Sequence, residues 1–125
     1  MKARSIRFPK FRMKSELDSF ERFLILRTER VIEMGLLFLI ILKLLARQPM
    51  TGSELRRVIS NAGFNLPHLT TLSTHLGVMK GMTLIESEKA GRGQRKTLHI
   101  TEKGLAVMKR AENHLQLLVM KLCHL

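Results

Sequence analysis

The sequence predicts a mainly α-helical fold with one small β-hairpin, on the strength of three observations. Apolar residues recur at spacings of three and four over most of the 125 residues, which is the period of an amphipathic helix. The spacing changes to alternation only between positions 84 and 100, around a glycine-rich segment, as is typical of a hairpin. Hydrophobic residues make up 45% of the chain, enough for one packed core. We therefore expect a single domain over residues 15–125, preceded by a basic, flexible arm over residues 1–14.

The first helix is expected to begin at Ser15, where a hydroxyl residue is followed three positions later by Asp18. This pair approximates a capping box, in which a side-chain oxygen accepts a free backbone N–H at the helix start. Apolar residues at 17, 20, 23 and 24 continue the helical period toward a second helix over Val31–Arg47. Its run of seven apolar residues, Leu36–Leu42, leaves no polar face, so this helix must be covered on all sides. One side can meet the core of so small a domain, and we expect the other to meet a partner subunit.

A pair of helices joined by a short link is expected after Pro49, which ends the preceding helix. Thr51–Glu54 has a full capping-box pattern, and the helix that it starts is expected to run to about Ala62, with Gly63 closing it. After the link, Pro67 suits the first position of the next helix. The inner stripe of that helix is expected to consist of Leu69, Leu72, Leu76 and Met79.

The outer face of this second helix carries small hydroxyl residues, and the chain has no acid between Pro67 and Ile85. A helix in the major groove of DNA approaches the base edges closely, where hydroxyls can donate or accept and threonine methyls can meet thymine methyls. Carboxylates there would be repelled by the phosphates. The residues expected to read bases are Thr70, Thr71, Ser73 and Thr74.

A hairpin and a long helix complete the chain. Strands are expected over Leu84–Lys89 and Arg95–Ile100, joined by the glycine-rich turn Ala90–Gln94. Thr101 is expected to cap a helix from Glu102 to about Leu122, whose apolar stripe is wider than one small core can use. The order of elements predicts a winged helix-turn-helix with an additional N-terminal helix and a long C-terminal dimerisation helix, in segments 15–47, 51–100 and 101–125.

The balance of charge points to a polyanionic partner. The chain has 22 Lys and Arg against 10 Asp and Glu, a net charge of +12, and six of the basic residues lie in the arm without any acid. The expected phosphate contacts of the arm are Lys2, Arg4, Arg7, Lys10 and Arg12. Those of the hairpin, which forms the wing, and of its flanks are Arg92, Gln94, Arg95, Lys96, Lys80, Arg56 and Arg57.

The same segments resemble the PadR-like and MarR-like families of winged-helix regulators. Thr51–Leu55 is similar to the PadR "SGYEL" motif, and Thr71–Leu76 to the "TLYRLL" of its recognition helix. Leu84–Ser87, Gly91–Gly93 and Leu98–Gly104 together resemble "GLIES…GRGRR…YRLTEKG". The resemblance covers roughly residues 34–122 and implies a DNA-binding transcriptional regulator.

Three positions depart from the family pattern. Thr83 stands where the family usually has glycine, Ser73 replaces its aromatic residue, and Thr74 replaces its arginine. These changes leave the predicted fold intact, but the family's typical base contacts are not carried over to positions 73 and 74. The extra helix before Val31 and the basic arm also lie outside the common pattern.

Other classes of function find little support in the sequence. The single cysteine, Cys123, cannot form an internal disulfide or a two-cysteine metal knuckle, which fits a reducing compartment. His68 and His75 lie seven residues apart without a third ligand at metal spacing. The uncharged stretch Met34–Leu42 is nine residues long, whereas a membrane-spanning helix needs about 20. The sequence offers no catalytic arrangement of a nucleophile, a base and an acid. We therefore expect that the protein is not an enzyme and that it needs no cofactor or metal.

We therefore expect a homodimeric, sequence-specific regulator of transcription that binds double-stranded DNA in the cytoplasm, near the nucleoid, and acts as a repressor. The alternative is a non-specific architectural protein, chromatin-like in role, with the same fold. The strong charge favours this alternative, as does the lack of Arg, Asn and Gln in the predicted base-reading helix. The operator and any small-molecule effector stay open.

Overall fold

The computed structural model describes residues 19–65, 68–89 and 96–125. Over these ranges the chain forms five helices and three short strands. They are α1 (Ser19–Gly35), α2 (Leu37–Arg47), β1 (Met50–Thr51), α3 (Gly52–Asn61), α4 (Leu69–Gly81), β2 (Ile85–Lys89), β3 (Lys96–Ile100) and α5 (Glu102–Cys123). The predicted winged helix-turn-helix, mainly α-helical with a small hairpin, is confirmed. The predicted arm at 1–14 and the helix start at Ser15 lie outside the described residues.

The sheet has three antiparallel strands in the order β1-β3-β2. The predicted hairpin is its β2–β3 pair, which runs in register from Ile85 opposite Ile100 to Lys89 opposite Lys96. The third strand, β1, was not predicted. It has only two residues and pairs Met50 with Leu98, so its register depends on a partner almost 50 positions away in the chain.

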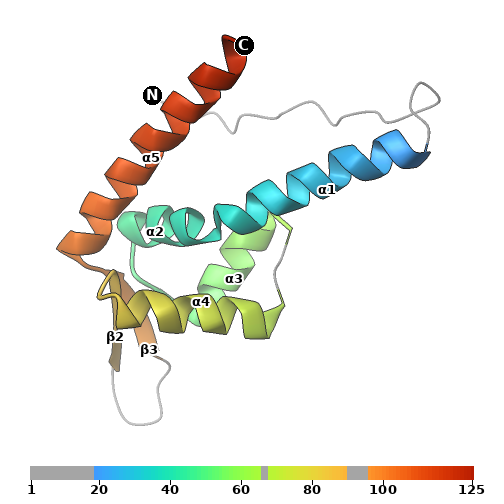
Figure 1. Cartoon of the computed structure of the whole chain (residues 1–125). Coiled ribbons are helices and arrows are strands. Elements are labelled where there is room, and N and C mark those ends of the chain that lie inside the picture. The colour runs from blue at the N-terminus through green and yellow to red at the C-terminus, as the bar shows by residue number, and fades with distance from the viewer. Residues whose placement is uncertain (1–18, 66–67, 90–95) are drawn as a thin grey trace, which may run out of the picture.

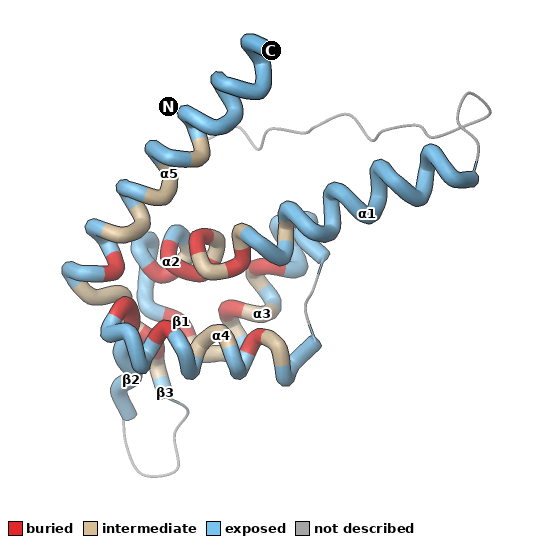
Figure 2. The backbone as a smooth tube through the Cα atoms, in the orientation of Figure 1, coloured by how far each residue is buried: buried red, intermediate tan, exposed pale blue. Residues whose placement is uncertain are grey.

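The core lies where α2, α3, α4 and the sheet meet (Figure 2). Its fully enclosed side chains come from α2, α3 and the start of β2, with less than 2% of their surface exposed: Ile41, Leu42, Leu55, Ile59 and Ile85. In contrast, α1 has no buried residue, and α5 buries only Gly104. Both helices extend away from the core in different directions (Figure 1).

The apolar helix α2 is covered within the chain itself. It contacts α5, α3, α1 and β3, and all of its residues from Leu37 to Leu45 except Lys43 are buried or half-buried. The assumption that one small domain cannot cover this helix is therefore wrong, because α5 and the sheet contribute to its cover. A contact between α2 and a partner subunit stays a prediction.

The break between the first two helices lies later than predicted. The expected boundary was at Val31, but α1 continues to Gly35 and α2 begins at Leu37. Glycine is a poor helix former, so the chain turns at Gly35 and Leu36, where the apolar period alone gave no signal.

The predicted helix caps of α3 and α5 are present. The Thr51 hydroxyl accepts the Glu54 backbone N–H at 3.2 Å, and the Glu54 carboxylate accepts the Thr51 N–H at 3.3 Å, which completes the capping box. After α3, Gly63 adopts a φ of +92°, a conformation that favours glycine. The Thr101 hydroxyl accepts the Gly104 N–H at 3.0 Å at the start of α5.

The inner stripe of α4 is shorter than predicted. Leu72 and Met79 are buried and Leu76 is half-buried, but Leu69 has 61% of its surface exposed. The helix begins at Leu69, after His68 as its N-cap, so the first turn projects past the edge of the core. Pro67, expected at the first helical position, lies outside the described residues and precedes the cap.

Candidate nucleic-acid interface

Helix α4 presents a hydroxyl face to solvent, which we define as Thr70, Ser73 and Thr74. All three residues are exposed. The Thr74 hydroxyl donates to the Thr70 carbonyl at 2.8 Å, so its hydrogen is engaged within the helix while its lone pairs stay available. Thr71, the fourth predicted base-reading residue, is half-buried, and its carbonyl oxygen lies 3.0 Å from the His75 Nδ1 atom. Three of the four predicted residues thus share one outer surface, and Thr71 lies at its edge.

Two glycines continue the outer surface of α4 beyond the hydroxyl face. Gly77 and Gly81 follow the hydroxyl face at helical spacing, and both are exposed, with no atom within 4 Å of where a Cβ would stand. Lys80 is exposed in the last turn. The face contains no carboxylate, so it can approach a polyanion closely.

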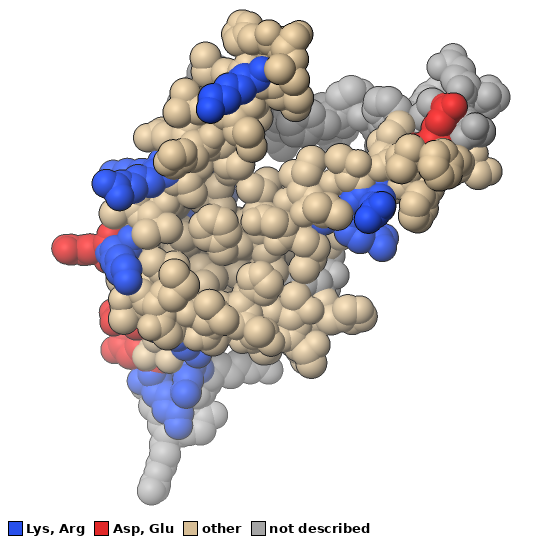
Figure 3. All heavy atoms as spheres, viewed as in Figure 1, with Lys and Arg blue, Asp and Glu red and all other residues tan. Residues whose placement is uncertain are grey.

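Cations gather next to α4 at the hairpin. Lys89 and Lys96 are exposed and stand opposite one another at the far end of the β2–β3 ladder. Figure 3 shows Lys and Arg side chains clustered at this end of the molecule, with acidic side chains further along the same edge. On β2, a carboxylate oxygen of Glu88 lies 3.3 Å from the His99 Nε2 atom on β3. The predicted wing residues Arg92, Gln94 and Arg95 lie outside the described residues.

A second cationic feature lies between α3 and the start of α4. It is a hollow of about 530 Å³, here called the cationic hollow, lined by Gly52, Ser53, Arg56, Arg57, Ser60, Asn61 and Leu69. Arg57 is exposed, whereas Arg56 is half-buried, and its Nε atom is enclosed without a hydrogen-bond partner among the described residues. The start of α3 adds the positive end of the helix dipole. Together these groups can hold an anion such as a phosphate.

The loop that leads into α4 is fastened to α1. The Glu33 carboxylate oxygen Oε2 accepts the Asn65 backbone N–H at 3.2 Å and the Asn65 side-chain amide at 2.6 Å. Sequence reasoning missed this contact, because 32 residues separate the two partners and neither position carries a motif. The link connects α1 to the entry of α4.

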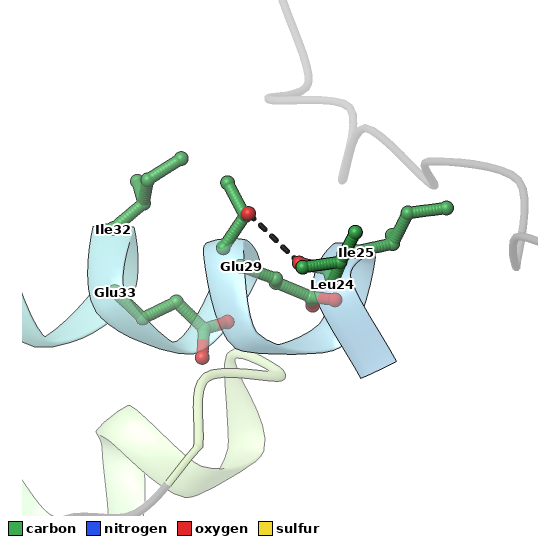
Figure 4. Close-up of a pocket in the computed structure, with 6 residues that line it drawn as sticks. Leu24, Ile25, Glu29, Ile32 and Glu33 are labelled. Carbon is green, nitrogen blue, oxygen red and sulfur yellow. Dashed lines mark hydrogen bonds between the residues drawn. The ribbon is translucent and has the colours of Figure 1, made fainter. Parts of the chain in front are cut away.

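Exposed apolar side chains lie on α1 and on the outer half of α5. On α1, a shallow hollow of about 480 Å³ is lined by Leu24, Ile25, Thr28, Glu29, Ile32 and Glu33. Figure 4 shows Ile25 and Ile32 directed away from α3. On α5, the exposed apolar residues of the last two turns have 54–68% of their surface exposed: Leu117, Leu118, Val119, Met120 and Leu122.

The inner half of α5 is held to the domain by close contacts. Gly104 packs against the backbone at Leu84. A Cβ at this position would stand 2.8 Å from the Cγ1 atom of Ile100. Near the middle of the helix, Glu112 forms an ion pair with Lys43 on α2 at 3.0 Å. Beyond Leu115, which is half-buried, every residue of α5 is exposed, and this part of the helix extends away from the core (Figure 2).

Two other kinds of site are not found in the described part of the chain. No three His, Cys, Asp or Glu residues there could hold one metal ion, and His68 and His75 have no third ligand. No helix among these residues is long and apolar enough to cross a membrane.

Solved structures of transcriptional regulators are similar to this chain. No protein-family model and no curated protein matches it. A Thermoplasma acidophilum protein described as a transcriptional regulator is 30% identical, with a TM-score of 0.61 over 73% of this chain and 89% of that one. A PadR-like transcriptional regulator from Bacillus cereus is 26% identical, with a TM-score of 0.64 over 70% of this chain and 88% of that one. A PadR-family regulator from Eggerthella lenta, at 22% identity, shares the fold with a TM-score of 0.73 over 84% of this chain and 90% of that one.

Proposed function

Because the chain belongs to the PadR-like family of winged-helix transcriptional regulators, we propose that it binds double-stranded DNA as a homodimer and selects its sites by sequence. In this proposal it represses transcription by occupying promoters. The same similarity indicates a regulator and not an enzyme. The observation that carries the proposal is the outer face of α4: exposed hydroxyls and glycines, no carboxylate, and cationic groups on both sides.

In the proposed complex, α4 lies in the major groove. Thr70, Ser73 and Thr74 contact base edges, and Thr71 contributes from the edge of the same surface. The exposed glycines favour this arrangement, because a helix without side chains at these positions can come close to the duplex. Each hydroxyl forms single, rotatable hydrogen bonds, so each discriminates less than the roughly 1–3 kcal/mol of a bidentate contact.

The proposed backbone contacts flank α4 on both sides. On one side the wing would supply Lys96 together with Arg92, Gln94 and Arg95, and the last turn of α4 would add Lys80. On the other side the cationic hollow supplies Arg56 and Arg57. Both arginines line this hollow, and their guanidinium groups carry N–H donors that phosphate oxygens can accept. The basic arm, with Lys2, Arg4, Arg7, Lys10 and Arg12, would add further phosphate contacts.

The proposed dimer is formed by α1 and the outer half of α5. Both carry large exposed apolar side chains in succession, which is more than isolated monomers usually leave in water. A two-fold dimer would place its two α4 helices about 34–36 Å apart, one turn of duplex, on a pseudo-palindromic site.

Selection from a random pool of duplexes is the experiment that tests sequence-specific binding. The selected sequence should bind more tightly than random duplex, and alanine at Thr70, Thr71, Ser73 or Thr74 should lower this ratio while leaving random-duplex binding nearly unchanged. A ratio that stays at the wild-type value in all four variants would show that α4 does not read sequence.

The second candidate is a non-specific architectural protein. The absence of Arg, Asn and Gln from α4 favours it, because these side chains make the strongest base contacts. A salt titration with random duplex and with the region upstream of the protein's own gene separates the two functions. Equal affinity for both duplexes at every salt concentration would establish the architectural role.

A further inference from the structure

Leu69 is an exposed leucine in the first turn of α4. Its exposed fraction is 61%, whereas Leu72, three residues later on the same helix, has 2% exposed. The helix starts before it reaches the core, so this one apolar side chain of the expected inner stripe stands in solvent.

Single exposed leucines are common on soluble proteins, and exposure alone identifies no ligand. The surroundings of Leu69 are more specific. Its side chain forms one wall of the cationic hollow, next to Arg56 and Arg57, while Thr70 of the hydroxyl face is its neighbour in sequence. The leucine therefore lies between groups suited to phosphate and groups suited to base edges.

The position in the helix supports a contact with bases. In helix-turn-helix proteins, the N-terminal residues of the recognition helix contact base edges in the major groove. The apolar group that bases present in this groove is the 5-methyl group of thymine, which occurs at A·T pairs alone. A leucine at this point contributes favourable binding free energy when it covers that methyl group. Against any other base, it would leave a polar edge without a hydrogen-bond partner.

We propose that Leu69 is a specificity-determining residue that reads one thymine in each half-site through its methyl group. This inference rests on the proposed function, since it requires α4 to lie in the major groove. It adds an apolar contact to a base-reading surface that is otherwise made of hydroxyls.

Deoxyuridine differs from thymidine only by the absence of this methyl group, so a uridine scan tests the contact. Each thymine of the selected duplex is replaced singly, and the affinity is measured for the wild type and for Leu69→Ala. At one position per half-site, the wild type should lose about fourfold in affinity, the effect of one buried methyl group. Leu69→Ala should bind the thymine duplex more weakly and should lose no further affinity on the change to uridine at that position.

Two control variants separate the methyl contact from general effects. Val78→Ala alters another exposed apolar residue of α4, which faces Phe38 and Val107 instead of the cationic hollow. This variant should lose as much affinity as the wild type when the contacted thymine is replaced by uridine. Leu69→Met keeps an apolar side chain, so it should show most of the affinity loss that the wild type shows on the change from thymine to uridine. Circular dichroism checks that the variants are folded, as expected for a change at an exposed residue.

The outcomes also separate this inference from the proposed function. If the wild type prefers its selected duplex but loses the same affinity as Leu69→Ala at every uridine position, the leucine does not read thymine, while sequence-specific binding stands. If the wild type shows no preference for any duplex, both proposals are overturned.

Discussion

Thr83 occupies a backbone position that suits glycine. Its φ is +59°, in the left-handed region, and it follows Met82, the C-cap of α4. The N–H of Leu84 donates to the Met79 carbonyl and the N–H of Thr83 to the Lys80 carbonyl, each at 3.0 Å, which is the pattern of a Schellman motif. The residue at this place is usually glycine, because a Cβ is strained there. The threonine hydroxyl offsets part of the strain by donating to the Met82 carbonyl at 2.6 Å.

Thr83→Gly should therefore stabilise the protein. Removing the Cβ relieves roughly 1–2 kcal/mol of left-handed strain, and the greater freedom of glycine in the unfolded chain cancels part of it, about 0.5–1 kcal/mol. The net gain of about 0.5–1 kcal/mol would be measured as a higher midpoint of urea unfolding at an unchanged slope. A lower midpoint would mean that the hydroxyl contacts outweigh the strain.

At Gly104 a glycine is required by close packing and not by the backbone conformation. A Cβ there would collide with the carbonyl oxygen of Leu84, a backbone atom that cannot move aside. Gly104→Ala should cost at least about 1–3 kcal/mol of unfolding free energy, the usual cost of overpacking.

Gly77→Ala is the matched control for this change. Gly77 lies inside a helix with nothing within 4 Å of its missing Cβ, so alanine should stabilise the protein by about 0.5–1 kcal/mol. Equal effects of the two substitutions would refute the argument from packing at Gly104.

At the scale of whole elements, local signals predicted most of the fold. The capping box at Thr51, the cap at Thr101 and the change of period at the hairpin depend on neighbouring residues, and each is found in the structure. What the sequence could not predict depends on distant partners. The strand β1 exists because Leu98 lies opposite Met50, and the loop before α4 is held by Glu33 of α1.

The candidate site shows the same division between local and distant causes. The period of three and four that makes Leu72 and Met79 inward-facing continues back to Leu69, but only the tertiary arrangement decides where the core ends. The pattern therefore assigned Leu69 to the interior. Similarly, α2 looked too apolar for one domain because the sequence does not reveal that α5 and the sheet cover it.

The wing makes a prediction at the scale of one element. Replacing both Arg92 and Arg95 by alanine should weaken binding to all duplexes similarly and reduce the slope of log affinity against log salt by about 0.9 for each phosphate that the wing no longer neutralises. As a control, the same double change at Lys109 and Arg110, exposed on α5 away from the wing, should leave the slope near the wild-type value. An unchanged slope in the wing variant would mean that the wing does not touch DNA.

At the scale of the whole molecule, the exposed apolar residues of α1 and α5 predict a dimer of twice 14.4 kDa in light scattering. Leu118→Glu should weaken association at least tenfold, a change of about 1.4 kcal/mol, because it brings a carboxylate into the apolar interface. Leu69→Glu is the matched control, since Leu69 has the same exposed fraction of 61% but lies on α4. It should leave the affinity between subunits near the wild-type value. A wild type that scatters as a monomer at micromolar concentration would contradict the proposed interface.

The hydrogen bonds between Glu33 and Asn65 join α1, with its exposed apolar side chains, to the segment that precedes α4. A partner that fixes the direction of α1 would thereby also fix the entry of α4, and a duplex that fixes α4 would act back on α1. If the proposed dimer is coupled to DNA in this way, thermodynamic reciprocity requires both effects to have the same size. The factor by which DNA would tighten the dimer then equals the factor by which dimerisation would tighten DNA binding. For the proposed dimeric regulator, the affinity between subunits would then set the protein concentration at which its DNA sites are occupied.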